Sequence, residues 1–287
     1  MELFSQLMVN GLVIGLTYAL FAVGLTLIFG ILHMANFAHG EFYMLGAFGA
    51  FILQNELGFG YFTSAIITII VIGILAFVLE KYVLSSLVDK EHLNSLLATF
   101  GLSIILLNLV IILYGNTPRQ IATPFEDVVQ IGTVFITQQR LFVLILGTLL
   151  IIIVGIFMKM SKWGKWMRAV SQNSMGAKVS GIPIKRVYII TFVIGTVLAT
   201  IAGILIGPTT YAVPYMGTSI MLKGFIIVIL GGLGSVPGAI LGALILGIGE
   251  TTAATFLGNS WRDLLGFAML ILILLIRPQG IFGFSRR

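Results

Sequence analysis

The sequence predicts an all-α integral membrane protein, a polytopic helical bundle of about eight or nine membrane segments. Three observations support this fold class: hydrophobic residues make up 59% of the 287 residues, charged residues only 9%, and the mean hydropathy is +1.12. A water-soluble core of this size could not enclose so much apolar surface. We therefore expect residues 1–287 to form a single transmembrane domain, with no separate soluble domain.

Apolar segments follow one another along the whole chain, and their lengths differ. Five approach or exceed the roughly 20 residues that cross a bilayer as a helix, namely 7–32, 61–80, 94–114, 140–158 and 187–207. Four are shorter and indicate broken or half-length helices, namely 41–54, 220–233, 236–249 and 260–276.

A glycine-rich break separates two of the short segments. It contains Gly231, Gly232, Gly234, Pro237 and Gly238. Glycine adopts backbone angles that other residues avoid, and proline interrupts the hydrogen bonding of a helix. We therefore expect two half-length helices that meet here, near the cytoplasmic side of the membrane.

Positive charge predicts the orientation of the chain. Residues 159–187 carry seven lysines and arginines and no acid, which is typical of a cytoplasmic loop. The C-terminus, with Arg277, Arg286 and Arg287, is expected on the same side. The loop 115–139 is then external, and its segment Val128–Ile136 is either a short strand or an interfacial turn. If every segment spans, the N-terminus lies outside; if 41–54 is re-entrant, the N-terminus lies inside.

Signatures of enzymes and metal sites are missing from the sequence. The chain has no cysteine, which excludes disulfides and thiolate sites, and its three histidines are scattered. Neither a phosphate-binding Gly-Lys loop, a dinucleotide loop nor a hydrolase motif is complete. We expect no catalytic residues, cofactor or metal. The net charge of +6 lies mostly in one loop and at the C-terminus, which favours orientation in an anionic membrane over nucleic-acid binding.

Polar residues at membrane depth are costly, and each is a candidate for a translocation path. The densest group lies between the first two apolar segments and includes Asn36, His39 and Glu41, while Asn108 is isolated in a later segment. The alternative is structural: Asn36 or His39 satisfies backbone groups at a helix break, and Glu41 suits the positive end of the helix that begins there. For Asn108 the structural alternative is a packing hydrogen bond or placement at the interface. Other acids lie near segment ends, which argues against ion-coupled transport.

The segment 165–179 has helical periodicity and more structure than a simple connector needs. Its candidate contact residues, with the glycine that follows, are Lys165, Trp166, Arg168, Ala169, Asn173, Ala177 and Gly181. One interpretation is an amphipathic helix that lies on the anionic leaflet. The other is a short coupling helix that seats in the cleft of a cytoplasmic motor protein.

At these residues the sequence resembles a known family. The pattern Arg168-Ala169-x-x-x-Asn173-x-x-x-Ala177-x-x-x-Gly181-Ile182 resembles the cytoplasmic loop of ABC importer permeases for branched-chain amino acids. The segments 36–41 (Asn-Phe-Ala-His-Gly-Glu) and 231–239 resemble two further motifs of that family, in the same order along the chain. The similarity is greatest to the H-type (LivH-like) subunit. One departure is that Arg168-Ala169 replaces the Glu-Ala-Ala core of other importers' coupling loops.

The resemblance implies a permease subunit that forms half of the translocation pathway of an ATP-driven importer. It implies as partners a second permease subunit of the M type, two cytoplasmic ABC ATPases and an extracytoplasmic solute-binding protein. The implied substrate is a branched-chain or other hydrophobic amino acid, and the implied location is the cell (inner or plasma) membrane of a prokaryote. Two alternatives are a related permease for urea or short amides and an ion-coupled secondary transporter.

Overall fold

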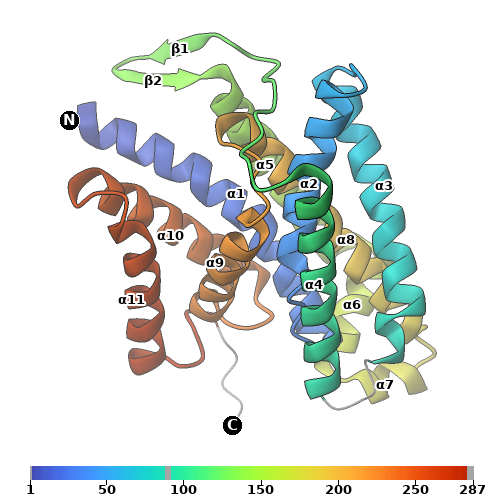
Figure 1. Cartoon of the computed structure of the whole chain (residues 1–287). Coiled ribbons are helices and arrows are strands. Elements are labelled where there is room, and N and C mark those ends of the chain that lie inside the picture. Colours follow the sequence, from blue (N-terminus) through green and yellow to red (C-terminus); the bar gives the residue numbers. More distant parts are fainter. Residues whose placement is uncertain (1, 88–91, 283–287) are drawn as a thin grey trace.

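The computed structural model describes residues 2–87 and 92–282 and is almost entirely helical (Figure 1). Arg286 and Arg287, expected in the cytoplasm, lie outside the described residues. The elements in chain order are α1 (Glu2–Leu32), α2 (His39–Asn55), α3 (Tyr61–Tyr82), η1 (Leu84–Ser86), α4 (His92–Tyr114), β1 (Val128–Ile131), β2 (Val134–Thr137), α5 (Gln138–Met160), α6 (Lys162–Gln172), α7 (Ser174–Val179), α8 (Ile184–Ile206), η2 (Gly207–Thr209), α9 (Met216–Gly231), α10 (Val236–Phe256) and α11 (Trp261–Ile276).

Six of these helices are long and apolar enough to cross a membrane: α1, α3 with η1, α4, α5, α8 with η2, and α10. Three shorter helices, α2, α9 and α11, have 17, 16 and 16 residues. Together they agree with the prediction of a helical membrane bundle with about eight or nine segments, some of them short. Helix α1 is the centre of this bundle, because it is buried along most of its length and packs against α5, α8 and α10.

The bundle has two opposite ends, which we name the hairpin face and the α6 face. At the hairpin face β1 pairs with β2 in antiparallel register, and Gly132 supplies the turn with φ of 63°. Of the two alternatives for Val128–Ile136, a short strand or an interfacial turn, the structure has strand, in the form of two short strands joined by a turn. The start of α1 is fixed there, since the side chain of Gln6 donates to Phe135 O at 2.9 Å. The N-terminus thus lies on the side of loop 115–139, as expected if every segment spans.

Helices α2 and α9 begin near the middle of the bundle rather than at one of its ends. His39 Nε2 lies 3.2 Å from Phe21 O, and Phe21 is eleven residues before the end of α1, or about 16 Å along its axis. Gly217, in the first turn of α9, packs against Gly40 in the first turn of α2. From this meeting point α2 runs to the hairpin face and α9 runs to the α6 face. Each is therefore the helical part of a broken segment.

The glycine-rich break separates α9 from α10 at the α6 face. Gly232 and Gly234 have φ of 100° and 82°, which favour glycine. Ser235 caps α10 by accepting a hydrogen bond from Gly238 N. The prediction of two half-length helices is wrong for α10, whose 21 residues extend about 31 Å and match a bilayer core. Of these two helices only α9 is short, because its first turn lies at mid-depth in the bundle.

Candidate functional site

The segment expected to form one helix over 165–179 is divided into two helices. Helix α6 ends at Gln172, and Asn173 leaves the helical region with φ of −157° and ψ of 99°. The side chain of Asn173 then accepts a hydrogen bond from Gly176 N at 2.8 Å, which caps α7. Asparagine is among the preferred N-cap residues, so the residue predicted as a contact also starts a new helix. The expectation of one continuous helix was wrong for this reason.

The residues predicted for coupling do not share one surface. Lys165, Arg168, Asn173 and Gly181 are exposed, and Trp166 and Ala169 are half-buried. Ala177 is buried within the chain itself, as are Met167 and Val170. The apolar side chains that face outward from α7 are instead Met175, 70% exposed, and Val179, 83% exposed.

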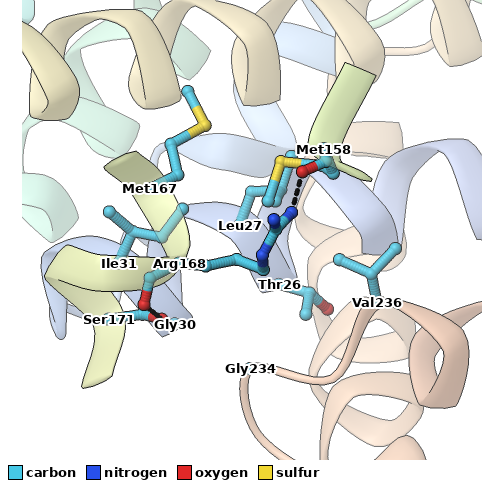
Figure 2. A pocket seen from close by; sticks show the side chains of 10 residues that line it. All are labelled: Thr26, Leu27, Gly30, Ile31, Met158, Met167, Arg168, Ser171, Gly234 and Val236. Atoms are coloured by element: carbon cyan, nitrogen blue, oxygen red, sulfur yellow. Dashed lines mark hydrogen bonds between the residues drawn. The ribbon is translucent and has the colours of Figure 1, made fainter. Parts of the chain in front are cut away.

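Helix α6 contacts the membrane helices at the end of α5, on the α6 face. The guanidinium of Arg168 donates to the carbonyl oxygen of Met158, as Figure 2 shows. Gly164 packs so closely against the backbone of Phe157 and Met158 that a side chain at position 164 would force these backbone atoms to move. Helix α6 is therefore held against the end of α5 by a hydrogen bond and by close backbone packing.

A small cavity of about 60 Å³ lies between α6 and three other parts of the chain (Figure 2). It is lined by residues of α1, α5 and α6 and by two residues of the glycine-rich break, Gly234 and Val236. Gly234 also packs against Gly30 of α1, with 2.9 Å between its Cα and the position of a Cβ on Gly30. The predicted coupling segment and the predicted helix break therefore meet at the end of α1.

Asn36, His39 and Glu41 are brought together at mid-depth, as the prediction of a path requires. All three are at most 1% exposed. Glu41 Oε1 accepts a hydrogen bond from Ser103 of α4 at 2.9 Å. Within the described residues, Glu41 Oε2, His39 Nδ1 and both amide atoms of Asn36 have no hydrogen-bond partner. The structural interpretation accounts for part of this group, since His39 Nε2 lies 3.2 Å from the backbone oxygen of Phe21 and Glu41 lies in the first turn of α2. It leaves the amide of Asn36 and the second oxygen of Glu41 unexplained, because unpaired buried polar groups are costly.

Asn108 does not belong to this group. It is exposed on α4, and its amide donates to the carbonyl oxygen of Ile104 in the same helix at 2.8 Å. This bond lies within one helix, so it satisfies the amide without packing two helices together.

An ion-pair network inside the bundle was not predicted from the sequence. Lys223 of α9 lies 2.7 Å from Glu250 Oε2 of α10, and Tyr18 of α1 donates to the same oxygen at 2.8 Å. Arg262 and Asp263, at the start of α11, complete the network with distances of 3.7 Å to Glu250 and 3.3 Å to Lys223. Glu250 looked isolated because its partners lie 27 and 232 residues away along the chain.

Comparisons with known proteins agree with this architecture. The family model described as branched-chain amino acid transport system / permease component matches residues 7–274. The chain is 34% identical to the high-affinity branched-chain amino acid transport system permease proteins LivH of Salmonella typhimurium and BraD of Pseudomonas aeruginosa. Both alignments cover 98% of this chain and 96% of the relative.

A more distant relative and the solved structures complete the comparison. The permease protein LivM of Escherichia coli is 24% identical over 94% of this chain and 68% of its own length. No solved structure matches. The family model covers most of the chain, and the relatives at 34% identity extend over nearly all of it. The chain therefore belongs to the family of permease components of branched-chain amino acid transport systems.

Proposed function

We propose that this chain forms half of the membrane pathway of an ATP-driven importer for branched-chain or other hydrophobic amino acids. The observation that carries the proposal is the match to permeases named for such transport over almost the full length of the chain. The M-type subunit would supply the other half, which is supported by the more distant similarity to LivM. Two ABC ATPases and a solute-binding protein would complete the importer in the inner membrane of a prokaryote.

In this proposal the α6 face is cytoplasmic, and α6 and α7 dock in the ATPases. The cations of 159–187 lie on this face, which follows the positive-inside rule. Met175 and Val179 are the anchors of the contact, because they are large, apolar and exposed on a six-residue helix. Ala177, which we expected to touch the ATPase, would position α7 from inside the chain.

The route from the ATPase into the membrane would pass through Arg168 and the end of α1. Arg168 holds the carbonyl of Met158, and the same cavity is lined by Gly234 of the break. A shift of α6 on nucleotide binding would change the packing of α1 against Gly234. This contact would bias the pathway between outward-open and inward-open states.

The substitution Met175→Asp tests the docking surface. A carboxylate buried in an apolar contact without a partner costs several kcal/mol, on the order of tenfold in binding or more. We expect the permease to reach the membrane with its partner subunit, while co-purification of the ATPases falls at least tenfold.

Val128→Asp is the matched control, since Val128 is apolar and 59% exposed on the hairpin face. It should leave ATPase co-purification unchanged. Normal ATPase recovery with Met175→Asp, together with normal solute-stimulated hydrolysis, would show that α7 does not dock in the ATPase.

A further inference from the structure

The first turns of α2 and α9 meet inside the membrane part of the bundle, and neither is capped by a side chain. A helix begins with backbone N–H groups that have no partner within the helix, and its N-terminus carries about half a positive charge. Gly40 and Gly217 bring the two ends into backbone contact, because a Cβ on Gly217 would lie 2.8 Å from Gly40 O. Two positive helix ends therefore converge at one point.

A buried acid is directed at this point. Glu41 is 1% exposed, and its Oε2 lies 2.6 Å from the position that a Cβ on Gly217 would take. That oxygen has no hydrogen-bond partner among the described residues, whereas Oε1 is bound by Ser103. One full negative charge and two half positive charges sum to about zero. The place thus suits a ligand that has no net charge but carries separated charges of both signs.

Polar and aromatic groups surround the same two helix ends. Asn36 lies in the turn that starts α2, since its carbonyl accepts from His39 N, and its buried amide has no partner in the described chain. Phe37 packs against Phe225 and Phe100, with ring centroids 5.2 and 6.0 Å away. These rings form an apolar wall next to the charged groups.

We propose that the paired first turns of α2 and α9, with Glu41 and Asn36, bind a zwitterionic α-amino acid during its passage. The ligand carboxylate accepts a hydrogen bond from the unpartnered amide of Asn36 and faces the positive ends of the two helices. Glu41 Oε2 holds the α-ammonium group, and the rings of Phe37, Phe100 and Phe225 contact an apolar side chain. This inference rests on the proposed function and adds the site at which the solute is held.

The test uses the complete permease–ATPase complex in lipid nanodiscs, without the solute-binding protein, and the substitution Glu41→Gln. The probes are leucine, leucinamide and 4-methylpentanoate; the second lacks the carboxylate charge, and the third lacks the ammonium group. We expect Glu41→Gln to weaken binding of leucine and leucinamide at least tenfold. Binding of 4-methylpentanoate should stay unchanged or become tighter, because its carboxylate no longer meets that of Glu41.

Glu80→Gln is the matched control. Glu80 is also fully buried in a membrane helix and has two unpartnered oxygens, but it lies in the last turns of α3, away from α9. This control should leave all three affinities unchanged, and co-purification of the subunits checks that both variants assemble.

Unchanged leucine binding in Glu41→Gln, or an equal loss for all three probes, would overturn this site while leaving the transport function intact. If the wild-type complex with its solute-binding protein takes up no hydrophobic amino acid, the proposed function fails and the site fails with it. A loss confined to the two ammonium-bearing probes supports the site.

Discussion

Two buried glutamates inside the bundle have opposite surroundings. Glu250 is 1% exposed and is bound by Lys223 and Tyr18, with Arg262 nearby. Glu41 is equally buried, but only Ser103 binds it, and its second oxygen has no partner in the described chain. The first acid connects α1, α9, α10 and α11, whereas the second faces the start of α9.

This difference separates a structural charge from one available to a ligand. A buried ion pair is tolerated when its partners are all present, and removing one of them leaves an uncompensated charge. Glu250 meets that condition within the chain. Glu41 does not, and an acid left half-satisfied at membrane depth is the kind of group that marks a functional site. The predictions below test whether the two acids differ in this way.

The largest effect is expected for Lys223→Ala. This change leaves Glu250 buried without its main partner, which costs about 3–5 kcal/mol in comparable cases. We expect a large loss of thermal stability of the purified complex in detergent, measured by the fraction that remains soluble after heating. Lys178→Ala, at an exposed position on α7, is the control and should have no measurable effect.

A compensating pair sharpens the same prediction. Replacing both partners by apolar residues, as Lys223→Met with Glu250→Leu, should recover most of the stability, since the buried carboxylate and its ammonium partner are removed together. Arg262 and Asp263 lose these partners but are the more exposed members of the network. A double variant as unstable as Lys223→Ala would mean that the network contributes more than charge compensation.

A smaller effect is expected for Gly217→Ala, which tests the contact between the two helix starts. The new Cβ would lie 2.6 Å from Glu41 Oε2 and 2.8 Å from Gly40 O, so the helices must move apart. Overpacking of this kind costs about 1–3 kcal/mol.

Gly101→Ala is the control, because a Cβ at that helical glycine meets nothing within 4 Å. The Gly101→Ala variant should be as stable as the wild type or slightly more stable, since alanine has a higher helix propensity than glycine. Equal melting temperatures of Gly217→Ala and Gly101→Ala would argue against a close contact between Gly217 and Gly40.

The membrane helices could be predicted because each depends on a local run of apolar residues. The hairpin and the break were also found locally, from Val128–Ile136 and from glycines such as Gly232 and Gly234, whose positive φ values suit that residue. The division of the segment 165–179 into two helices was not predicted, although Asn173 indicated it. An asparagine favours an N-cap as strongly as a contact, and periodicity alone does not separate the two.

The arrangement of the site could not be predicted, because it depends on residues far apart in the sequence. Gly40 meets Gly217, and Tyr18 meets Glu250, with separations of 177 and 232 residues. No local sequence pattern indicates that Glu250 pairs with a cation in the folded chain and that Glu41 does not. The starts of α2 and α9 at mid-depth were missed for the same reason, since a short apolar segment has the same composition at any depth.

The smallest effect is expected for the stability of Glu41→Gln, and it completes the comparison with Glu250→Gln. At Glu41 the amide oxygen still accepts from Ser103, so that hydrogen bond is kept. The variant loses the attraction between a carboxylate and a helix N-terminus, about 0.3–2 kcal/mol. It also avoids the cost of burying a charge, which acts in the opposite direction. We therefore expect a net change within about 1 kcal/mol.

At Glu250 the same replacement removes the buried partner of Lys223 and leaves it only the exposed carboxylate of Asp263, so the loss should be several-fold larger, about 3 kcal/mol or more. Melting of the two purified variants, compared side by side in one detergent, measures this difference. If Glu41→Gln melts as early as Glu250→Gln, then Glu41 is a structural charge like its counterpart. Its free oxygen would then no longer argue for a ligand between α2 and α9.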